Sequence, residues 1–346
     1  MKFLSQSILA KNLIWPFTAL LFLWSQSSAL ACDLCAIYRA TNARGESSSG
    51  FLFTLSQQFI DDGTFQLNGK PFHDPRVDPR FEQSYLDTSI THLVPTYNFS
   101  EQFGVSLNLP IIYRSFRRVQ QVTGNPELED ETGTVFGLGD ISLVGRWTPL
   151  HISRMKYSIV GSLFAGVKFP TGDTERLDQE VEQEEQLRAD FGVGHNHPFG
   201  GIHQHDLTLG SGSFDGVFGG AVTLRWDRWF LSSQGQYYLR TEANQYEFGD
   251  EIVISGGPGV YILSNVGSTL TLQANAVYDT MASDTVLGLK STETGWTGWF
   301  LGPQLNFTWG DHFSANAGVD LPLHIINNGF QTVPDYRIHG GVSWRF

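Results

Sequence analysis

The last eleven residues of the chain are Tyr336-Arg-Ile-His-Gly-Gly-Val-Ser-Trp-Arg-Phe346. Apart from Gly340, the even-numbered positions are apolar, whereas Arg337, His339, Ser343 and Arg345 occupy odd-numbered ones. Successive side chains of a strand point to opposite faces, so this segment would have one apolar face and one polar face. It therefore predicts a strand that lies between an apolar medium and water.

The same alternation recurs upstream. It is clear from Phe103 to Tyr113 and from Phe313 to Leu323. Similar runs cover residues 157–167, 214–226, 229–239, 270–278 and 299–309, and weaker ones lie near 50–60, 85–97, 138–147 and 252–263. With the C-terminal segment these runs predict about twelve strands. An even number places both ends of a bacterial barrel on the periplasmic side.

The links between the predicted strands alternate in length. The short links are 98–102, 151–156, 227–228, 264–267 and 310–312, and the long ones are 61–83, 114–136, 168–213, 241–251, 280–295 and 325–335. Outer-membrane barrels have short periplasmic turns and longer outer loops, with aromatic girdles at the membrane surfaces. The aromatic residues that bracket short links here are Tyr97, Trp226, Trp229, Trp309 and Phe313. We therefore expect an all-β fold, a closed antiparallel transmembrane β-barrel in the bacterial outer membrane. The alternative is a water-soluble all-β protein.

Residues 1–31 have the pattern of a secretory signal peptide. Lys2 and Lys11 precede the apolar run 13–24, and Ala29-Leu30-Ala31 is a small-residue cleavage site. A membrane anchor is the alternative, but the apolar run is shorter than the roughly 20 residues that span a bilayer. We expect cleavage before Cys32, a short periplasmic segment at 32–49 and the barrel at 50–346.

Cys32 and Cys35 would stand at the new N-terminus, where an oxidising periplasm favours a local disulfide. A haem attachment motif would need His after the second Cys, but Ala36 is there. A poor lipobox precedes Cys32, which argues against lipidation. A thiol metal site is the open alternative.

The chain has 22 basic and 35 acidic side chains, so its charge gives no sign of a nucleic-acid partner. The expected partners are outer-membrane lipid and lipopolysaccharide. A terminal Phe346 on an amphipathic strand also resembles the signal by which the barrel-assembly machinery recognises its substrates.

Two turn-rich motifs carry a family resemblance. Lys168-Phe-Pro-Thr-Gly-Asp173 ends one predicted strand, and Leu209-Gly-Ser-Gly-Ser-Phe-Asp215 opens the next. Residues 137–346 thereby resemble the outer-membrane family named for the meta pathway of phenol degradation. The resemblance implies a barrel transporter, with no definite substrate. The two Cys and the His-rich loop depart from the family pattern.

The alternation assigns a set of charged side chains and His to the lumen. These residues are Asp140, Arg146, Lys168, Asp215, Arg225, Arg240, Asp320, His324, Arg337, His339 and Arg345. Charged side chains that face lipid cost free energy. These residues occupy the positions that alternate with the apolar ones, which supports the assignment of that face to the lumen. They either fill and stabilise a closed lumen or line a path that selects ions.

The long loop 168–213 contains Gly194-His-Asn-His-Pro-Phe-Gly-Gly-Ile-His-Gln-His-Asp206. Residues two apart in an extended segment face the same way, so the loop offers two chelating pairs. With the following carboxylate, the candidate ligands for Zn²⁺, Cu²⁺ or Ni²⁺ are His195, His197, His203, His205 and Asp206. The alternative is a polar loop whose His side chains are solvated or plug the mouth.

An acidic run precedes these His residues. Its acidic members are Asp173, Glu175, Asp178, Glu180, Glu182, Glu184, Glu185 and Asp190. Such a run is usually a solvated face, here with a turn or two of helix. The alternative is that it concentrates cations or bridges to lipopolysaccharide through divalent ions.

No catalytic motif is present in the sequence, so we expect no enzyme. A barrel hydrolase would need Ser and His on the outward face, where the pattern offers Ser233 but no His unless His92 turns outward. The expected function is a channel for a small solute or ion, with loop 168–213 constricting the mouth. The charge and His content favour a cation or metal-related substrate over a bulky nutrient. The alternative is a closed barrel whose outer loops bind metal or lipopolysaccharide.

Overall fold

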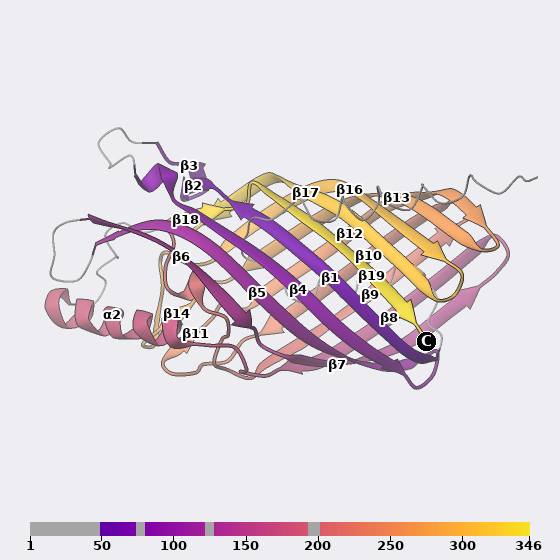
Figure 1. The fold of residues 1–346 in the computed structure, drawn as a ribbon, viewed down its shortest axis with the longest axis horizontal. Coiled ribbons are helices and arrows are strands. Elements are labelled where there is room, and N and C mark those ends of the chain that lie inside the picture. The colour runs from indigo at the N-terminus through magenta and orange to yellow at the C-terminus, as the bar shows by residue number, and fades with distance from the viewer. Residues whose placement is uncertain (1–48, 74–79, 122–127, 193–200) are drawn as a thin grey trace, which may run out of the picture.

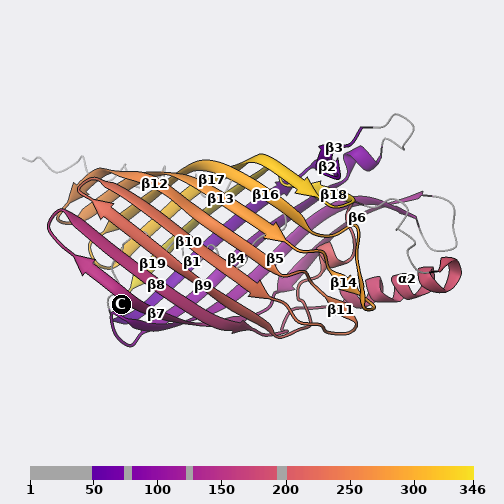
Figure 2. The same ribbon diagram turned by 180° about the vertical axis from the view of Figure 1, so that it is seen from behind.

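A computed structural model describes residues 49–73, 80–121, 128–192 and 201–346, and its long strands wind around one barrel (Figures 1 and 2). The signal peptide, Cys32, Cys35, His195 and His197 lie outside the described residues. Among the described helices, none is long and apolar enough to cross a membrane.

The wall of the barrel consists of long strands joined in chain order. They are β1 (Gly50–Asp62), β4 (Tyr85–Asn98), β5 (Phe103–Gln121), β6 (Leu128–Leu138), β7 (Ser142–Ser153), β8 (Tyr157–Lys168), β9 (Asp215–Trp226), β10 (Trp229–Leu239), β12 (Glu251–Asn265), β13 (Ser268–Met281), β16 (Trp296–Trp309), β17 (Phe313–Asn327) and β19 (Tyr336–Arg345). Every pairing between them is antiparallel.

Pairing of the first strand with the last closes the sheet. β1 lies between β4 and β19, from Leu52 opposite Arg345 to Asp61 opposite Tyr336. β6 and β7 both pair with β5 and are separated only by residues 139–141, so they are two halves of one strand. The result is the expected closed barrel of twelve antiparallel strands.

The two ends of the barrel differ as the link lengths predict. The short-turn end has the links 99–102, 154–156, 227–228, 266–267 and 310–312. Phe346 lies at this end, with its ring 5.5 Å from that of Phe51. The long-loop end has the remaining six links, which contain all the short elements.

These short elements give the long-loop end a structure of its own. β2 (Thr64–Leu67), β3 (Lys70–Pro71) and β18 (Phe330–Val333) form one small sheet, and β11 (Tyr246–Glu247), β14 (Thr285–Val286) and β15 (Leu289–Lys290) form another. The helices are η1 (Phe81–Gln83), α2 (Glu175–Phe191) and η2 (His205–Leu207). α2 lies outside the rim, on the same side as the projecting ends of β5 and β6 (Figures 1 and 2).

Side chains alternate between the two surfaces of the barrel. Along β1, Thr54, Ser56 and Gln58 point inward and are buried, whereas Leu55 between them is 41% exposed. Trp226, Trp229 and Trp309 are exposed at the short-turn end, as expected of aromatic residues at such a rim. The outer surface is thus apolar and the interior largely polar.

Two sequence predictions were wrong in detail. The link predicted at 114–136 is mostly strand, because β5 continues to Gln121 and β6 begins at Leu128. His324, predicted in the lumen, lies on the outer face opposite Trp299, which is 49% exposed. The cause is a β-bulge: Phe300 pairs with Pro322, so one extra residue reverses the facing of the rest of β17.

The facing can be tested on one strand with one kind of substitution. Val222 is exposed on the outer face of β9, and Thr223 beside it points inward opposite Ser232. A charge that faces lipid near the midplane costs about 2 to 4 kcal/mol. We expect Val222→Arg to lower the free energy of unfolding in lipid vesicles by that amount, measured by urea titration, and Thr223→Arg to change it much less. Equal losses would contradict the assigned facing.

Candidate functional site

The long link between β8 and β9 folds back into the barrel. Residues 201–213, which we call the mouth segment, pack their apolar side chains against inward-facing strand residues. Ile202 and Leu207 contact a buried cluster that contains Ile60, Leu86 and Phe116. Leu209 packs on Ile90 and Ile112. The apolar residues of this segment therefore pack inside the barrel at the long-loop end. That they constrict a solute path stays a prediction.

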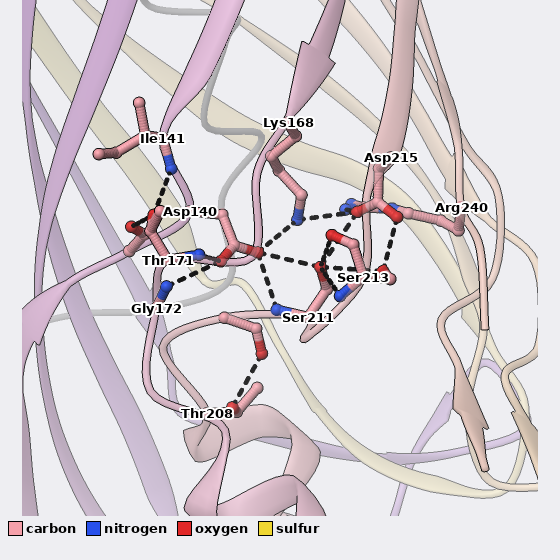
Figure 3. Close-up of polar contacts among 12 residues, drawn as sticks. Asp140, Ile141, Lys168, Thr171, Gly172, Thr208, Ser211, Ser213, Asp215 and Arg240 are labelled. Atoms are coloured by element: carbon pink, nitrogen blue, oxygen red, sulfur yellow. Dashed lines mark hydrogen bonds and ion pairs between the residues drawn. The ribbon is translucent and has the colours of Figure 1, made fainter. Parts of the chain in front are cut away.

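Asp140 holds the mouth segment to the wall (Figure 3). Its Oδ1 accepts hydrogen bonds from the backbone N–H groups of Thr171 (3.1 Å) and Gly172 (3.0 Å). Its Oδ2 accepts from the backbone N–H (2.8 Å) and hydroxyl (3.0 Å) of Ser211. Lys168 Nζ lies 3.0 Å from the same oxygen. A buried carboxylate with this many donors fixes three segments in one geometry.

The network continues along the rim, from β8 and β9 to the neighbouring β10 and β12. Lys168 Nζ also lies 3.1 Å from Asp215 Oδ2, which receives Arg240 Nη1 at the same distance. Arg240 Nη2 donates to Glu251 Oε2 at 3.0 Å. Positive and negative groups therefore alternate around this part of the rim, with Lys168 placed between two buried aspartates.

Two glycines allow the mouth segment to approach the wall closely near Asp140. A Cβ on Gly172 would lie 2.4 Å from the carbonyl oxygen of Leu209. One on Gly210 would lie 2.6 Å from Asp140 Oδ1 and 2.8 Å from the Cα of Gly172. Both glycines belong to the turn-rich motifs singled out in the sequence, so these motifs form one contact between the wall and the mouth segment.

The structure brings four of the predicted lumen residues together, namely Asp140, Lys168, Asp215 and Arg240. The others lie apart from that network, and among them Asp320 and His339 pair with each other. Arg337 pairs with Asp279 at 2.9 Å and His339 with Asp320 at 3.4 Å. Arg146 donates to Asn98 (2.6 Å), Arg225 lies over the ring of Tyr261, and Arg345 points inward opposite Leu52.

Of the predicted metal ligands, His203, His205 and Asp206 are described. The two imidazoles stack with centroids 5.4 Å apart. His205 Nδ1 lies 2.7 Å from Glu180 Oε1, and its Nε2 lies 3.4 Å from Asp206 Oδ1. Within the described ranges, no group of three or more His, Cys, Asp or Glu is arranged to hold a metal ion. The site with all four imidazoles stays a prediction.

The charged forms of His205 and Glu180 stabilise each other in this arrangement. Burial by itself would lower the pKa of His205, but the carboxylates of Asp206 and Glu180 outweigh it and raise the pKa to about 10. Burial would likewise raise the pKa of Glu180, but the neighbouring His205 lowers it to about 2. At neutral pH the imidazole is protonated, and a protonated ring offers no lone pair to a metal.

The acidic run forms a longer helix than the sequence suggested. α2 has 17 residues, and Leu177 and Val181 on its inner face pack with Tyr246 and Val286. Most of its carboxylates are solvated as expected, but Glu180 is buried. The pair between Glu180 and His205 therefore connects the outer helix to the mouth segment.

Sequence reasoning missed several residues of this region because the predicted strands ended too early. Asp279 and Trp296 continue the inward alternation of β13 and β16 just beyond the predicted ends. Arg114, whose Nη1 donates to the carbonyl oxygen of Thr208, was assigned to a loop.

His92 points inward and is buried, with Nδ1 3.0 Å from Asn108 Oδ1, so it is not an outward partner for Ser233.

Comparisons with known proteins place this fold among barrels. No model of a protein family and no curated protein matches the sequence. An outer-membrane channel from Pseudomonas putida F1 is similar with a TM-score of 0.53, over 86% of this chain and 96% of that one, at 11% identity. This identity shows a shared fold alone.

Two further similarities are weaker. The β domain of the Bordetella autotransporter BrkA gives a TM-score of 0.42 at 12% identity, over 86% of this chain and all of that one. The monoaromatic hydrocarbon channel CymD gives 0.38 at 10% identity, over 93% and 95% of the two chains. The fold of outer-membrane barrels is shown by the strand pairing and by the Pseudomonas channel. The resemblance to the phenol-degradation family stays an interpretation of two short motifs.

The pair between Glu180 and His205 predicts a pH dependence of the loop structure. The raised pKa of His205 contributes stability that is complete below about 6.5 and is lost as the pH rises toward 10. The lowered pKa of Glu180 contributes stability that is complete above about 4.5 and is lost as the pH falls toward 2. We expect the amide protection of α2, corrected for intrinsic exchange, to be greatest between about 4.5 and 6.5. Glu180→Gln should flatten this profile, and an unchanged profile in the variant would assign the dependence to other groups.

Proposed function

We propose that this protein is a channel of the bacterial outer membrane for a small organic solute, gated by the mouth segment. The observation that carries the proposal is the built constriction: a closed barrel has a segment of its own chain docked inside one end through Asp140. A purely structural barrel needs no such segment. The shared fold with an outer-membrane channel supports the membrane location.

The inner wall favours an organic solute over a bare ion. Val94, Val144, Phe164, Val217 and Phe300 belong to a buried apolar cluster built from inward-facing residues of many strands. An apolar part of the inner wall gives contact to an amphipathic solute, whereas a bare ion gains nothing from it. We do not include a metal in the proposal, because within the described ranges no group of three or more His, Cys, Asp or Glu is arranged to hold one.

A closed barrel is the second candidate, and one observation favours it. Many inward polar side chains are almost inaccessible to solvent, among them Thr54 and His92 (0% exposed) and Asn108 (1%). Salt bridges and hydrogen bonds would then fill the interior, and the long loops would bind lipopolysaccharide or another surface partner.

Conductance in planar bilayers separates the two candidates. We expect the wild-type protein to conduct in brief openings. Asp140→Ala removes the acceptor for Thr171, Gly172 and Ser211, so the mouth segment should detach and the open fraction should rise several-fold. Asp130→Ala is the control, because Asp130 lies at the exposed rim and its nearest partners are Arg117 at 3.5 Å and Arg80 at 3.8 Å. If neither the wild type nor Asp140→Ala conducts, the proposal of a channel is wrong and the closed barrel becomes the supported function.

A further inference from the structure

Two neighbouring turns at the short-turn end carry an excess of positive charge. The turn between β7 and β8 contains Arg154 and Lys156, and the turn between β9 and β10 contains Arg228. The two turns lie side by side, because the backbone N–H of Asp227 donates to the carbonyl oxygen of Lys156 at 2.7 Å. We call Arg154, Lys156 and Arg228 the basic patch.

The charges of the basic patch are exposed and are not neutralised by the described part of the chain. All three side chains are exposed to solvent. Arg154 Nη1 donates to the carbonyl oxygen of Ser153 at 3.3 Å, and none of the three side chains forms an ion pair with a described residue. Asp227 is the one acidic residue of these two turns, so three positive charges stand against one negative charge. The patch is therefore available to an anion from outside the protein.

The excess is confined to one sector of this rim. The turn between β4 and β5 carries Glu101, the turn between β12 and β13 carries no charged residue, and the turn between β16 and β17 carries Asp311 and His312. The whole chain has a formal net charge of −13, so cations gathered on two adjacent turns run against its composition. Such a local cationic surface attracts a partner with negative charge.

Aromatic side chains lie on the outer surface directly beside the basic patch. Trp226 is opposite Tyr157 on one neighbouring strand and opposite Trp229 on the other. The three side chains are 73% (Trp226), 43% (Tyr157) and 61% (Trp229) exposed. In membrane proteins, Trp and Tyr on the outer surface mark the level of the lipid headgroups.

The sequence places the cations at that same level. Lys156 immediately precedes Tyr157, and Arg228 immediately precedes Trp229. The aliphatic stems of Lys and Arg can lie along an apolar surface while their charged ends stay in the polar layer. The patch and the aromatic side chains together therefore offer one surface to the two parts of a lipid, cations for a phosphate group and rings for acyl chains.

We propose that the basic patch, with Tyr157, Trp226 and Trp229, binds a phospholipid whose headgroup has a net negative charge. The phosphate group accepts hydrogen bonds from the guanidinium and ammonium groups, and the acyl chains contact the rings. A zwitterionic phospholipid lacks the net charge that the patch attracts. The inference goes beyond the proposed channel and rests on that proposal only for the location of the barrel in a membrane.

Native mass spectrometry of the full chain in an uncharged detergent tests the proposal, because it counts the lipids bound to each protein. The probes are phosphatidylglycerol and phosphatidylcholine with the same acyl chains. We expect phosphatidylglycerol to bind at least about fivefold more tightly, which is the effect of one Lys or Arg near an anionic headgroup. Equal binding of the two lipids would overturn the proposal.

Glycerol 3-phosphate separates a lipid from a free phosphate compound, because it has the charged group without the acyl chains. We expect an equal concentration of it to leave the bound phosphatidylglycerol in place. Displacement of the lipid would show a site for soluble phosphate compounds, and the lipid site would be wrong.

Variants locate the binding. Replacing Arg154, Lys156 and Arg228 together by Gln should lower the affinity for phosphatidylglycerol to that for phosphatidylcholine. Arg154→Lys with Arg228→Lys keeps the charge and should keep the preference. The matched control replaces Lys70, Arg80 and Arg117 by Gln, which removes three positive charges at the long-loop end. Equal loss of the preference in this control would assign it to the net charge of the protein and overturn the site.

The lipid measurement and the conductance measurement fail independently. A protein that conducts but does not prefer phosphatidylglycerol is a channel without this lipid site. A protein that prefers phosphatidylglycerol but never conducts has the lipid site on a closed barrel.

Discussion

The structure depends on one constraint, that the backbone N–H and C=O groups of a sheet need partners at both of its edges. β1 meets this need by pairing with β19 on one side and β4 on the other, from Leu52 to Asp61. Once the sheet is closed, the side chain of each strand residue points either to the outer surface or to the interior. The polar residues then collect inside, and in the lumen Lys168 lies within ion-pair distance of both Asp140 and Asp215.

The interior also explains why the mouth segment is bound by charges as well as by apolar contacts. Ile202, Leu207 and Leu209 supply apolar surface, but the surrounding wall carries Arg114 and Asp140, which need partners when they are covered. The carbonyl oxygen of Thr208 and the N–H of Ser211 provide them. The docked segment therefore supplies hydrogen-bond partners to the buried charged side chains of the wall. These side chains in turn fix the position of the segment.

Much of this architecture could be predicted from period-two alternation, because a closed barrel imposes that period on every strand. The prediction was wrong where the backbone interrupts the period. The bulge opposite Trp299 turned His324 outward, and nothing in the local sequence marks the extra residue. Asp279 and Trp296 were missed because the predicted strands stopped short of them.

The contacts of the long loops could not be predicted, because they join residues far apart in the chain. Glu180 belongs to an acidic run whose composition indicates solvent, yet it pairs with a His 25 residues later. Such partners are decided by tertiary packing after the strands are in place, and only the glycine motifs around Gly172 and Gly210 gave a local sign of close approach.

The break between β6 and β7 couples the outer part of the barrel to the mouth segment. Above residues 139–141, β6 pairs with β5 alone among the described strands, and the two form a ribbon beyond the rim (Figure 1). An isolated two-stranded hairpin is marginally stable. Arg118 joins this ribbon to the mouth segment, since it binds Glu131 and donates to the carbonyl oxygen of Ile202. The ribbon and the mouth segment therefore support each other, so a change that released the segment from the lumen would also remove a contact that stabilises the ribbon outside it.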